Sequence, residues 1–121
     1  MVQVISTAER AREVQKTLRP LLDALGVKEV LKAEASAFHN YPPVGWSIIA
    51  DNVKIQGYFA IRRERGERVQ RFVIEIEERK SGATKGEFAF CLPKDFINDT
   101  WRGALDLTMR NINIILADLG S

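Results

Sequence analysis

Residues 53–80, VKIQGYFAIRRERGERVQRFVIEIEERK, constrain the fold of this chain more than any other segment. Two runs rich in β-branched and aromatic residues lie on either side of Arg65-Gly66, and this pattern is typical of a β-hairpin with a two-residue turn. The runs GWSIIA at 45–50 and KGEFAFCL at 85–92 have the same character and are separated from the hairpin by short turns. The sequence therefore predicts a four-stranded antiparallel β-meander over residues 45–92.

The register of the meander follows from its turns, because a two-residue turn fixes which residues face each other. With Asp51-Asn52 and Arg65-Gly66 as turn centres, one face is almost entirely apolar, and its predicted pairs are Trp46 with Gly57, Ile48 with Ile55, Gly57 with Ile74, Ile55 with Ile76, and Phe59 with Phe72. This face is the predicted core. The opposite face receives Lys54 opposite Glu77, Tyr58 opposite Val73, and Ala60 opposite Arg71.

Helical patterns lie on both sides of the predicted sheet. An apolar stripe over residues 11–25 follows a capping box formed by Ser6 and Glu9, which predicts an N-terminal helix. Pro20 lies inside the stripe and is expected to kink or restart the helix, because its ring removes one backbone hydrogen bond. Residues 27–38 are compatible with either a helix or a strand.

Residues 95–119 carry the most helical pattern of the chain. Apolar residues spaced by four and three form a heptad stripe of Trp101, Leu105, Thr108, Ile112, Ile115 and Leu119. Two interpretations remain open for this stripe. It can be buried under the chain's own N-terminal helices, or it can form a homodimer interface through Trp101, Leu105, Ile112, Ile115 and Leu119.

With 121 residues, the chain is long enough for one domain with its own core. We expect a single α+β domain over 1–121, with a helical region at 6–38, an antiparallel sheet at 45–92 and a long C-terminal helix at 95–119. No apolar run approaches the roughly 20 residues that cross a bilayer, and the N-terminal segment lacks the apolar core of a signal peptide. We therefore expect a cytoplasmic protein with no membrane partner.

The sequence offers little chemistry for catalysis. His39 is the one histidine, which excludes a histidine-rich metal site. Cys91 is the one cysteine and lies on a predicted strand, not at a helix start where the pKa of a thiol falls. No glycine-rich phosphate loop, HExxH or CxxC pattern is present. We expect a protein that is not an enzyme and that binds no metal or cofactor.

A cluster of arginines at the hairpin turn indicates binding instead. Its members are Arg62, Arg63, Arg65, Arg68 and Arg71. The planar guanidinium binds phosphate through two N–H groups and also stacks on bases, and single-stranded nucleic acid is held by such groups together with aromatic side chains. Tyr58 is the aromatic residue predicted on the non-core face. The alternative is a solvated hairpin tip, which Glu75 and Glu77 on the same face favour.

The run RFVIEIEERKSGATKGEFAFCLPKDFINDTW at 71–101 resembles the end of the meander and the helix entry in the PC-four/Whirly type of single-strand binder. The layout as a whole is similar to the archaeal ThermoDBP family of single-stranded DNA-binding proteins. The resemblance implies a cleft between sheet and helices that holds a single strand, and dimerisation through the C-terminal helix. It also implies a floor that includes Tyr58 and a basic rim of Lys54, Arg62, Arg63, Arg65, Arg68 and Arg71.

Taken together, these patterns predict a non-catalytic protein that binds single-stranded nucleic acid, DNA or RNA, as a homodimer or higher homo-oligomer. The alternative is a dimeric protein-binding or chaperone-like module with no nucleic-acid role. Salt separates the two, because phosphate contacts weaken as salt rises whereas an apolar peptide groove is nearly indifferent to it.

Overall fold

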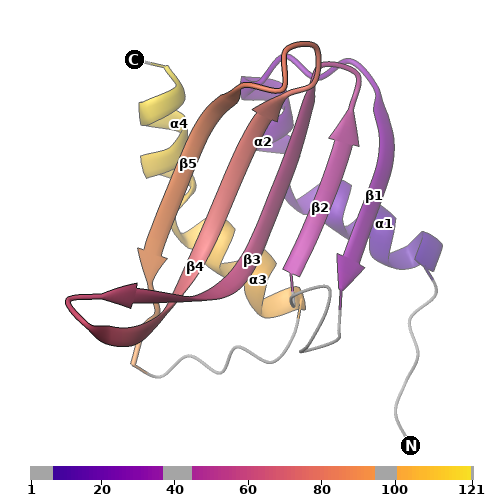
Figure 1. The fold of residues 1–121 in the computed structure, drawn as a ribbon. Helices are drawn as coiled ribbons and strands as arrows, with labels where there is room; N and C mark the ends of the chain where they lie inside the picture. Colours follow the sequence, from indigo (N-terminus) through magenta and orange to yellow (C-terminus); the bar gives the residue numbers. More distant parts are fainter. Residues whose placement is uncertain (1–6, 37–44, 95–100, 121) are drawn as a thin grey trace, which may run out of the picture.

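The computed structural model describes residues 7–36, 45–94 and 101–120. Within these ranges the chain forms two layers, a five-stranded antiparallel sheet of order β1-β2-β3-β4-β5 and four helices on one of its faces (Figure 1). The elements are α1 (Thr7–Thr17), α2 (Arg19–Ala24), β1 (Val30–Ser36), β2 (Gly45–Ala50), β3 (Val53–Glu64), β4 (Glu67–Glu78), β5 (Thr84–Cys91), α3 (Trp101–Arg110) and α4 (Ile112–Leu119). No described element covers the other face of the sheet, which we call the open face (Figure 1). None of the described helices is long and apolar enough to cross a membrane.

The α+β class is confirmed, but the sheet has five strands where the sequence predicts four. The fifth strand is β1, so the predicted helical region 6–38 is wrong over residues 30–36. Burial alternates along β1 as in a strand, since Ala33 is buried while Lys32 and Glu34 are exposed and form an ion pair. Pairing with β2 gives this segment backbone hydrogen bonds along one of its edges, and together with the burial of Ala33 this outweighs the helix preference of its alanines.

The predicted register of the meander is confirmed. The face that packs against the helices contains the pairs Trp46–Gly57, Ile48–Ile55, Gly57–Ile74, Ile55–Ile76 and Phe59–Phe72, and the open face contains Lys54–Glu77, Tyr58–Val73 and Ala60–Arg71. A Cβ added to Gly57 would lie 2.5 Å from Cε2 of Trp46, so the indole fills the space that the glycine leaves. Because side chains alternate along a strand, this register decides which residues reach the open face.

The N-terminal helical stripe is divided at Pro20, as the sequence predicts. Helix α2 begins at Arg19 with Pro20 in its first turn, where the missing N–H removes no helical hydrogen bond. Gly26 follows the helix in the left-handed region, with φ of 67°, a conformation that glycine adopts without strain. The predicted capping residue Ser6 lies outside the described residues.

The predicted long C-terminal helix is instead two helices, α3 and α4, interrupted at Asn111. Residues 95–100 lie outside the described ranges. The Asn111 side chain donates from Nδ2 to the carbonyl oxygen of Leu107 at 2.8 Å, and a side chain that bonds its own backbone competes with a continuous helix. The backbone carbonyl of Asn111 then accepts the N–H of Ile115 at 3.2 Å, which begins α4 in a new direction (Figure 1).

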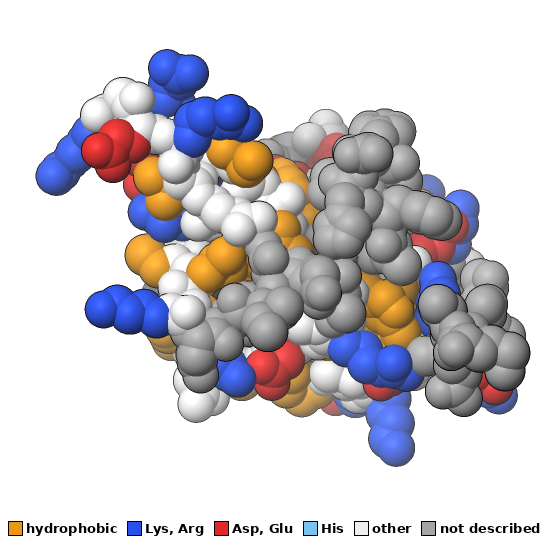
Figure 2. Space-filling model, turned by 90° about the horizontal axis from the view of Figure 1, so that it is seen from below, with side chains coloured by type: hydrophobic (Ala, Val, Ile, Leu, Met, Phe, Trp, Pro, Cys, Tyr) orange, Lys and Arg blue, Asp and Glu red, His pale blue; other side chains and the backbone are white. Residues whose placement is uncertain are grey.

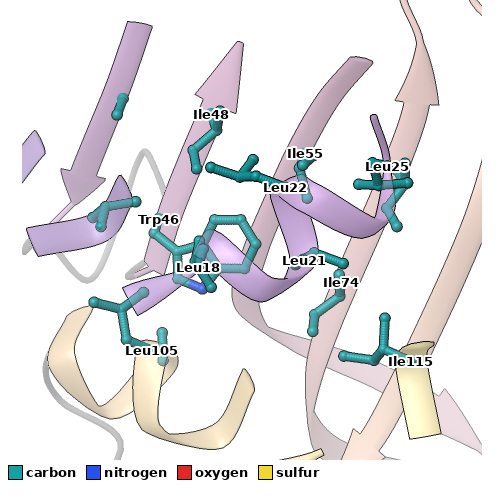
Figure 3. Packing of buried hydrophobic residues seen from close by; sticks show 14 of the residues in the cluster. Leu18, Leu21, Leu22, Leu25, Trp46, Ile48, Ile55, Ile74, Leu105 and Ile115 are labelled. Atoms are coloured by element: carbon teal, nitrogen blue, oxygen red, sulfur yellow. The ribbon is translucent and has the colours of Figure 1, made fainter. Parts of the chain in front are cut away.

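The hydrophobic core lies between the sheet and the helices. Figure 3 shows its side chains pointing toward one another from both layers, with Leu18, Leu21, Leu22, Leu25, Trp46, Ile48, Ile55, Ile74, Leu105 and Ile115 labelled. Trp46 also donates from Nε1 to Oγ1 of Thr108 at 3.1 Å, and this hydroxyl donates to the carbonyl oxygen of Ala104 at 2.8 Å. The indole therefore joins β2 to α3 by a buried hydrogen bond as well as by apolar contact.

The apolar stripe of the C-terminal helices faces this core. Trp101, Leu105 and Ile115 are buried, while Ile112 and Leu119 are half-buried and pack against the same cluster. Trp101, Leu105 and Ile115 are thus occupied within the protomer, while Ile112 and Leu119 keep part of their surface exposed. Self-association stays a prediction without an assigned interface.

Candidate nucleic-acid interface

Strands β3 and β4 extend beyond the strands on either side of them. Among the described residues, β2 pairs with β3 only as far as Gly45–Tyr58, and β5 pairs with β4 only as far as Arg71–Cys91. Residues 60–70 continue as a two-stranded hairpin, which we call the arm (Figure 1). The arm projects from the end of the sheet and presents its side chains on two sides.

The turn of the arm is formed by Arg65 and Gly66, as the sequence predicts. Both residues have positive φ, 53° for Arg65 and 81° for Gly66, which is the conformation of a type I′ turn. Such a turn matches the right-handed twist of the flanking strands and keeps the hairpin regular to its end. It places the Arg65 side chain at the tip of the molecule, where it is exposed.

The predicted contact residues do not share one face. Alternation along β3 and β4 places Lys54, Tyr58, Arg62 and Arg71 on the open face. It places Arg63 and Arg68, which are direct cross-strand partners, on the side that continues the helix-covered face. The predicted basic rim is therefore divided into two groups. Lys54, Arg62 and Arg71 form the open-face group, and Arg63, Arg68 and the tip residue Arg65 form the second group.

The two arginines of the open-face group are already bound to carboxylates. Arg62 Nη2 lies 2.8 Å from Oε1 of Glu87, and Arg71 Nε lies 3.0 Å from Oε2 of Glu64. The bond to Glu87 raises the pKa of Arg62 above its already high ordinary value. Neither arginine presents an unoccupied guanidinium to a ligand.

Tyr58, the predicted floor residue, is also engaged. Its hydroxyl donates to Oε1 of Glu75 at 2.8 Å, and Gln56 donates to the other carboxylate oxygen. Burial and this bond to Glu75 raise the pKa of Tyr58 from 10.0 to about 12. The tyrosine is therefore held in place as a neutral donor.

The open face beside Tyr58 is acidic. A hollow lies there, lined by Lys54, Gln56, Glu75, Ile76, Glu77, Thr84 and Glu87. Three of these side chains are carboxylates and one is a lysine, so the hollow repels a phosphate group more than it attracts one. The centre of the open face is therefore acidic and does not supply the basic rim that the resemblance implies.

The second group of arginines lies on the arm and has no such partners. Arg63, Arg65 and Arg68 are exposed and take part in no ion pair among the described residues. Figure 2 shows Lys and Arg side chains gathered at the projecting end of the hairpin, in the upper left of the view. Arg63 and Arg68 face each other directly across the strands, and like charges in that position are destabilising unless an anion neutralises them.

Ile61 adds an apolar surface to the arm that the sequence reasoning missed. Its side chain is 60% exposed, although it follows Phe59 on the face that packs against the helices. The predicted register already places Ile61 on the core face, one position beyond Phe59 on that face, and Phe59 is the last large residue of β3 that is buried. Ile61 and the arginines of the arm together combine apolar and cationic surface.

No cluster of His, Cys, Asp and Glu among the described residues could hold a metal ion, and His39 lies outside the described ranges. Cys91 is an exposed free thiol at the end of β5. Comparisons with protein-family models, with curated proteins and with solved structures found no match.

The bond between Tyr58 and Glu75 leads to a prediction about stability at high pH. Folded Tyr58 keeps its proton up to about pH 12, whereas unfolded tyrosine ionises near its ordinary pKa of 10.0. The stabilisation is therefore complete below pH 10 and is lost as the pH rises toward 12. In urea unfolding between these limits, the free energy of unfolding should fall more steeply for the wild type than for Tyr58→Phe. Parallel pH profiles would show that the bond is not formed in solution.

Proposed function

We propose that this chain binds single-stranded nucleic acid through the arm and catalyses no reaction. One observation carries the proposal: three exposed arginines on a projecting hairpin, Arg63, Arg65 and Arg68, have no carboxylate partner among the described residues. Each guanidinium can donate two parallel N–H groups to a phosphate. Arg63 and Arg68 face each other across β3 and β4, so a bound anion reduces the repulsion between their like charges.

The arm suits a single strand better than a duplex. In an unpaired strand the bases are free to lie against apolar and guanidinium surfaces, whereas a duplex hides their faces in its own stack. Ile61 supplies exposed apolar surface beside the arginines, and arginine itself stacks on bases. Phosphate contacts and base contacts are thus available on the same short hairpin.

Exposed apolar surface among the described residues is scattered. The exposed large hydrophobic residues are Leu31, Ile61 and Ile114, which lie on β1, β3 and α4 respectively. Isolated apolar side chains of this kind are common on soluble proteins and do not by themselves form a docking surface. Nothing in their placement favours the alternative, a protein-binding module, over nucleic-acid binding.

The test is fluorescence anisotropy of labelled single-stranded DNA and RNA, with a duplex of the same sequence as the control. Three phosphate contacts at about 0.7 each predict that log K falls with log salt at a slope of about −2 for single strands. The duplex should bind more weakly than the single strands at every salt concentration. A slope near zero would favour the protein-binding alternative, and equal binding of the duplex would refute the preference for single strands.

A further inference from the structure

We infer that Glu64 and Glu87 set the extent of the nucleic-acid site, by holding Arg71 and Arg62 in ion pairs that exclude phosphate from the open face. The inference rests on the proposed function and adds a role for two acidic residues. In the wild-type protein, the strand contacts Arg63, Arg65 and Arg68 and neither Arg62 nor Arg71. When the two carboxylates are neutralised, the site extends from the arm onto the open face.

Arg62 and Arg71 lie close enough to act together on one strand. Arg62 is opposite Val69 and Arg71 is opposite Ala60, so the two arginines are diagonal neighbours across β3 and β4. Diagonal neighbours on one face of an antiparallel pair are about 7–8 Å apart. Both belong to the open face at the base of the arm, next to the position of Tyr58.

Glu64 occupies two neighbouring N–H groups of Arg71 that a phosphate would use, and Glu87 occupies one N–H group of Arg62. Glu64 accepts from both Nε and Nη2 of Arg71, at 3.0 and 3.2 Å, which is the forked arrangement that arginine also makes with phosphate. Glu87 accepts from Nη2 of Arg62 at 2.8 Å. A phosphate that displaced either carboxylate would break an existing ion pair and would then lie beside the freed negative charge. Both effects oppose the exchange.

The arrangement of the partners separates the two groups of arginines. Glu64 is the last residue of β3 before the turn of the arm, and Glu87 lies on the neighbouring edge strand β5. Alternation places both residues on the same side of the sheet as Arg62 and Arg71. Arg63 and Arg68 point to the other side of the arm and are not among the ion pairs of the described residues. Two carboxylates thus determine which arginines are available and which are not.

The test compares the salt dependence of single-strand binding by the wild type with that of Glu64→Gln and Glu87→Gln. Each substitution should make the slope of log K against log salt steeper by about 0.7, because one more arginine becomes free to contact a phosphate. The same contact should raise the affinity about fivefold at about 0.1 M salt. Both glutamates are partly exposed surface residues, so these variants should fold like the wild type.

Two controls separate a freed arginine from a simple change of charge. Glu13→Gln removes one negative charge from another carboxylate–arginine pair, Glu13–Arg102, which lies on the helices, and it should leave binding unchanged. In a protein that already carries Arg62→Gln, the substitution Glu87→Gln should no longer steepen the slope. Each control therefore changes the charge without providing a new phosphate contact.

The outcomes also distinguish this inference from the proposed function. If the wild type binds and neither glutamate substitution changes the slope, the inference is overturned and the arm remains the site. If Glu87→Gln strengthens binding equally with and without Arg62, the effect is general electrostatics and the inference is again overturned. If neither the wild type nor the two variants bind a single strand, the proposed function itself fails.

Discussion

Trp46→Ala is expected to lower the free energy of unfolding by about 3–5 kcal/mol, the usual cost of removing a large aromatic side chain from a core. The indole is 3% exposed, fills the space above Gly57 and donates to Thr108 on α3. Its loss leaves a cavity between the sheet and α3 and removes the hydrogen bond that joins them. Chemical denaturation monitored by circular dichroism measures the change.

Two matched variants show which part of this loss comes from which contact. Trp46→Phe keeps most of the apolar contact and removes the bond to Thr108, so it should cost about 1 kcal/mol through that bond, with a further packing cost for the smaller ring. Ile61→Ala changes an exposed residue and should stay within about 0.5 kcal/mol of the wild type. A loss below about 1 kcal/mol for Trp46→Ala would mean that Trp46 does not join the two layers.

The triple substitution Arg63→Gln, Arg65→Gln and Arg68→Gln is expected to lower the affinity for single-stranded nucleic acid about 100-fold at about 0.1 M salt. Three lost phosphate contacts, each contributing about 0.7 to the dependence of log K on log salt, give about two units of log K under these conditions. Glutamine keeps a polar side chain at each exposed position, so the fold should be unaffected. Anisotropy titration at one salt concentration measures the loss.

The matched control removes three other exposed cations, Arg12, Lys16 and Arg19, by substitution with glutamine. These residues lie on α1 and α2, in the helical layer, and the net charge changes by the same amount. Charges more than about 10 Å from the ligand are largely screened at this salt concentration, so the affinity should change little. Equal losses in the two triple variants would mean that net charge, rather than the arm, controls binding.

The sheet register could be predicted from the sequence because its information is local. Arg65-Gly66 and Asp51-Asn52 are two-residue turns, and each turn fixes every pair of its hairpin. Bulky Trp46 opposite Gly57 then provides an independent check, since a one-residue slip would move both to the other face. The α+β class and the restart of the helix at Pro20 follow from equally local patterns.

Two parts of the fold depend on contacts that the sequence pattern does not display. The segment of β1 has alanines that favour a helix, and only its pairing with β2 decides that it is a strand. Asn111 falls inside a continuous heptad pattern, yet the helix is interrupted there, where the Asn111 side chain donates to the carbonyl oxygen of Leu107. The spacing of apolar residues carries no information about a polar side chain that forms a hydrogen bond with its own backbone.

The candidate site was predictable by residue type and only in part by geometry. The sequence identifies the arginines of the hairpin, and its predicted register already separates Arg62 from Arg63 by alternation, although the expected basic rim included both. It gives no sign that Glu87, far from Arg62 in the chain, lies 2.8 Å from it in the fold. Ion pairs between strands depend on side-chain positions that only the three-dimensional structure provides.

The most direct test of the central claim is to map the contact surface by two-dimensional ¹H–¹⁵N nuclear magnetic resonance while a single-stranded oligonucleotide is added. The account predicts the largest changes in chemical shift at the amides of residues 61–70, with smaller changes at Lys54 and Tyr58 on the acidic open face. Binding that leaves residues 61–70 unchanged, with the shifts confined to the helices or to β1, would contradict it.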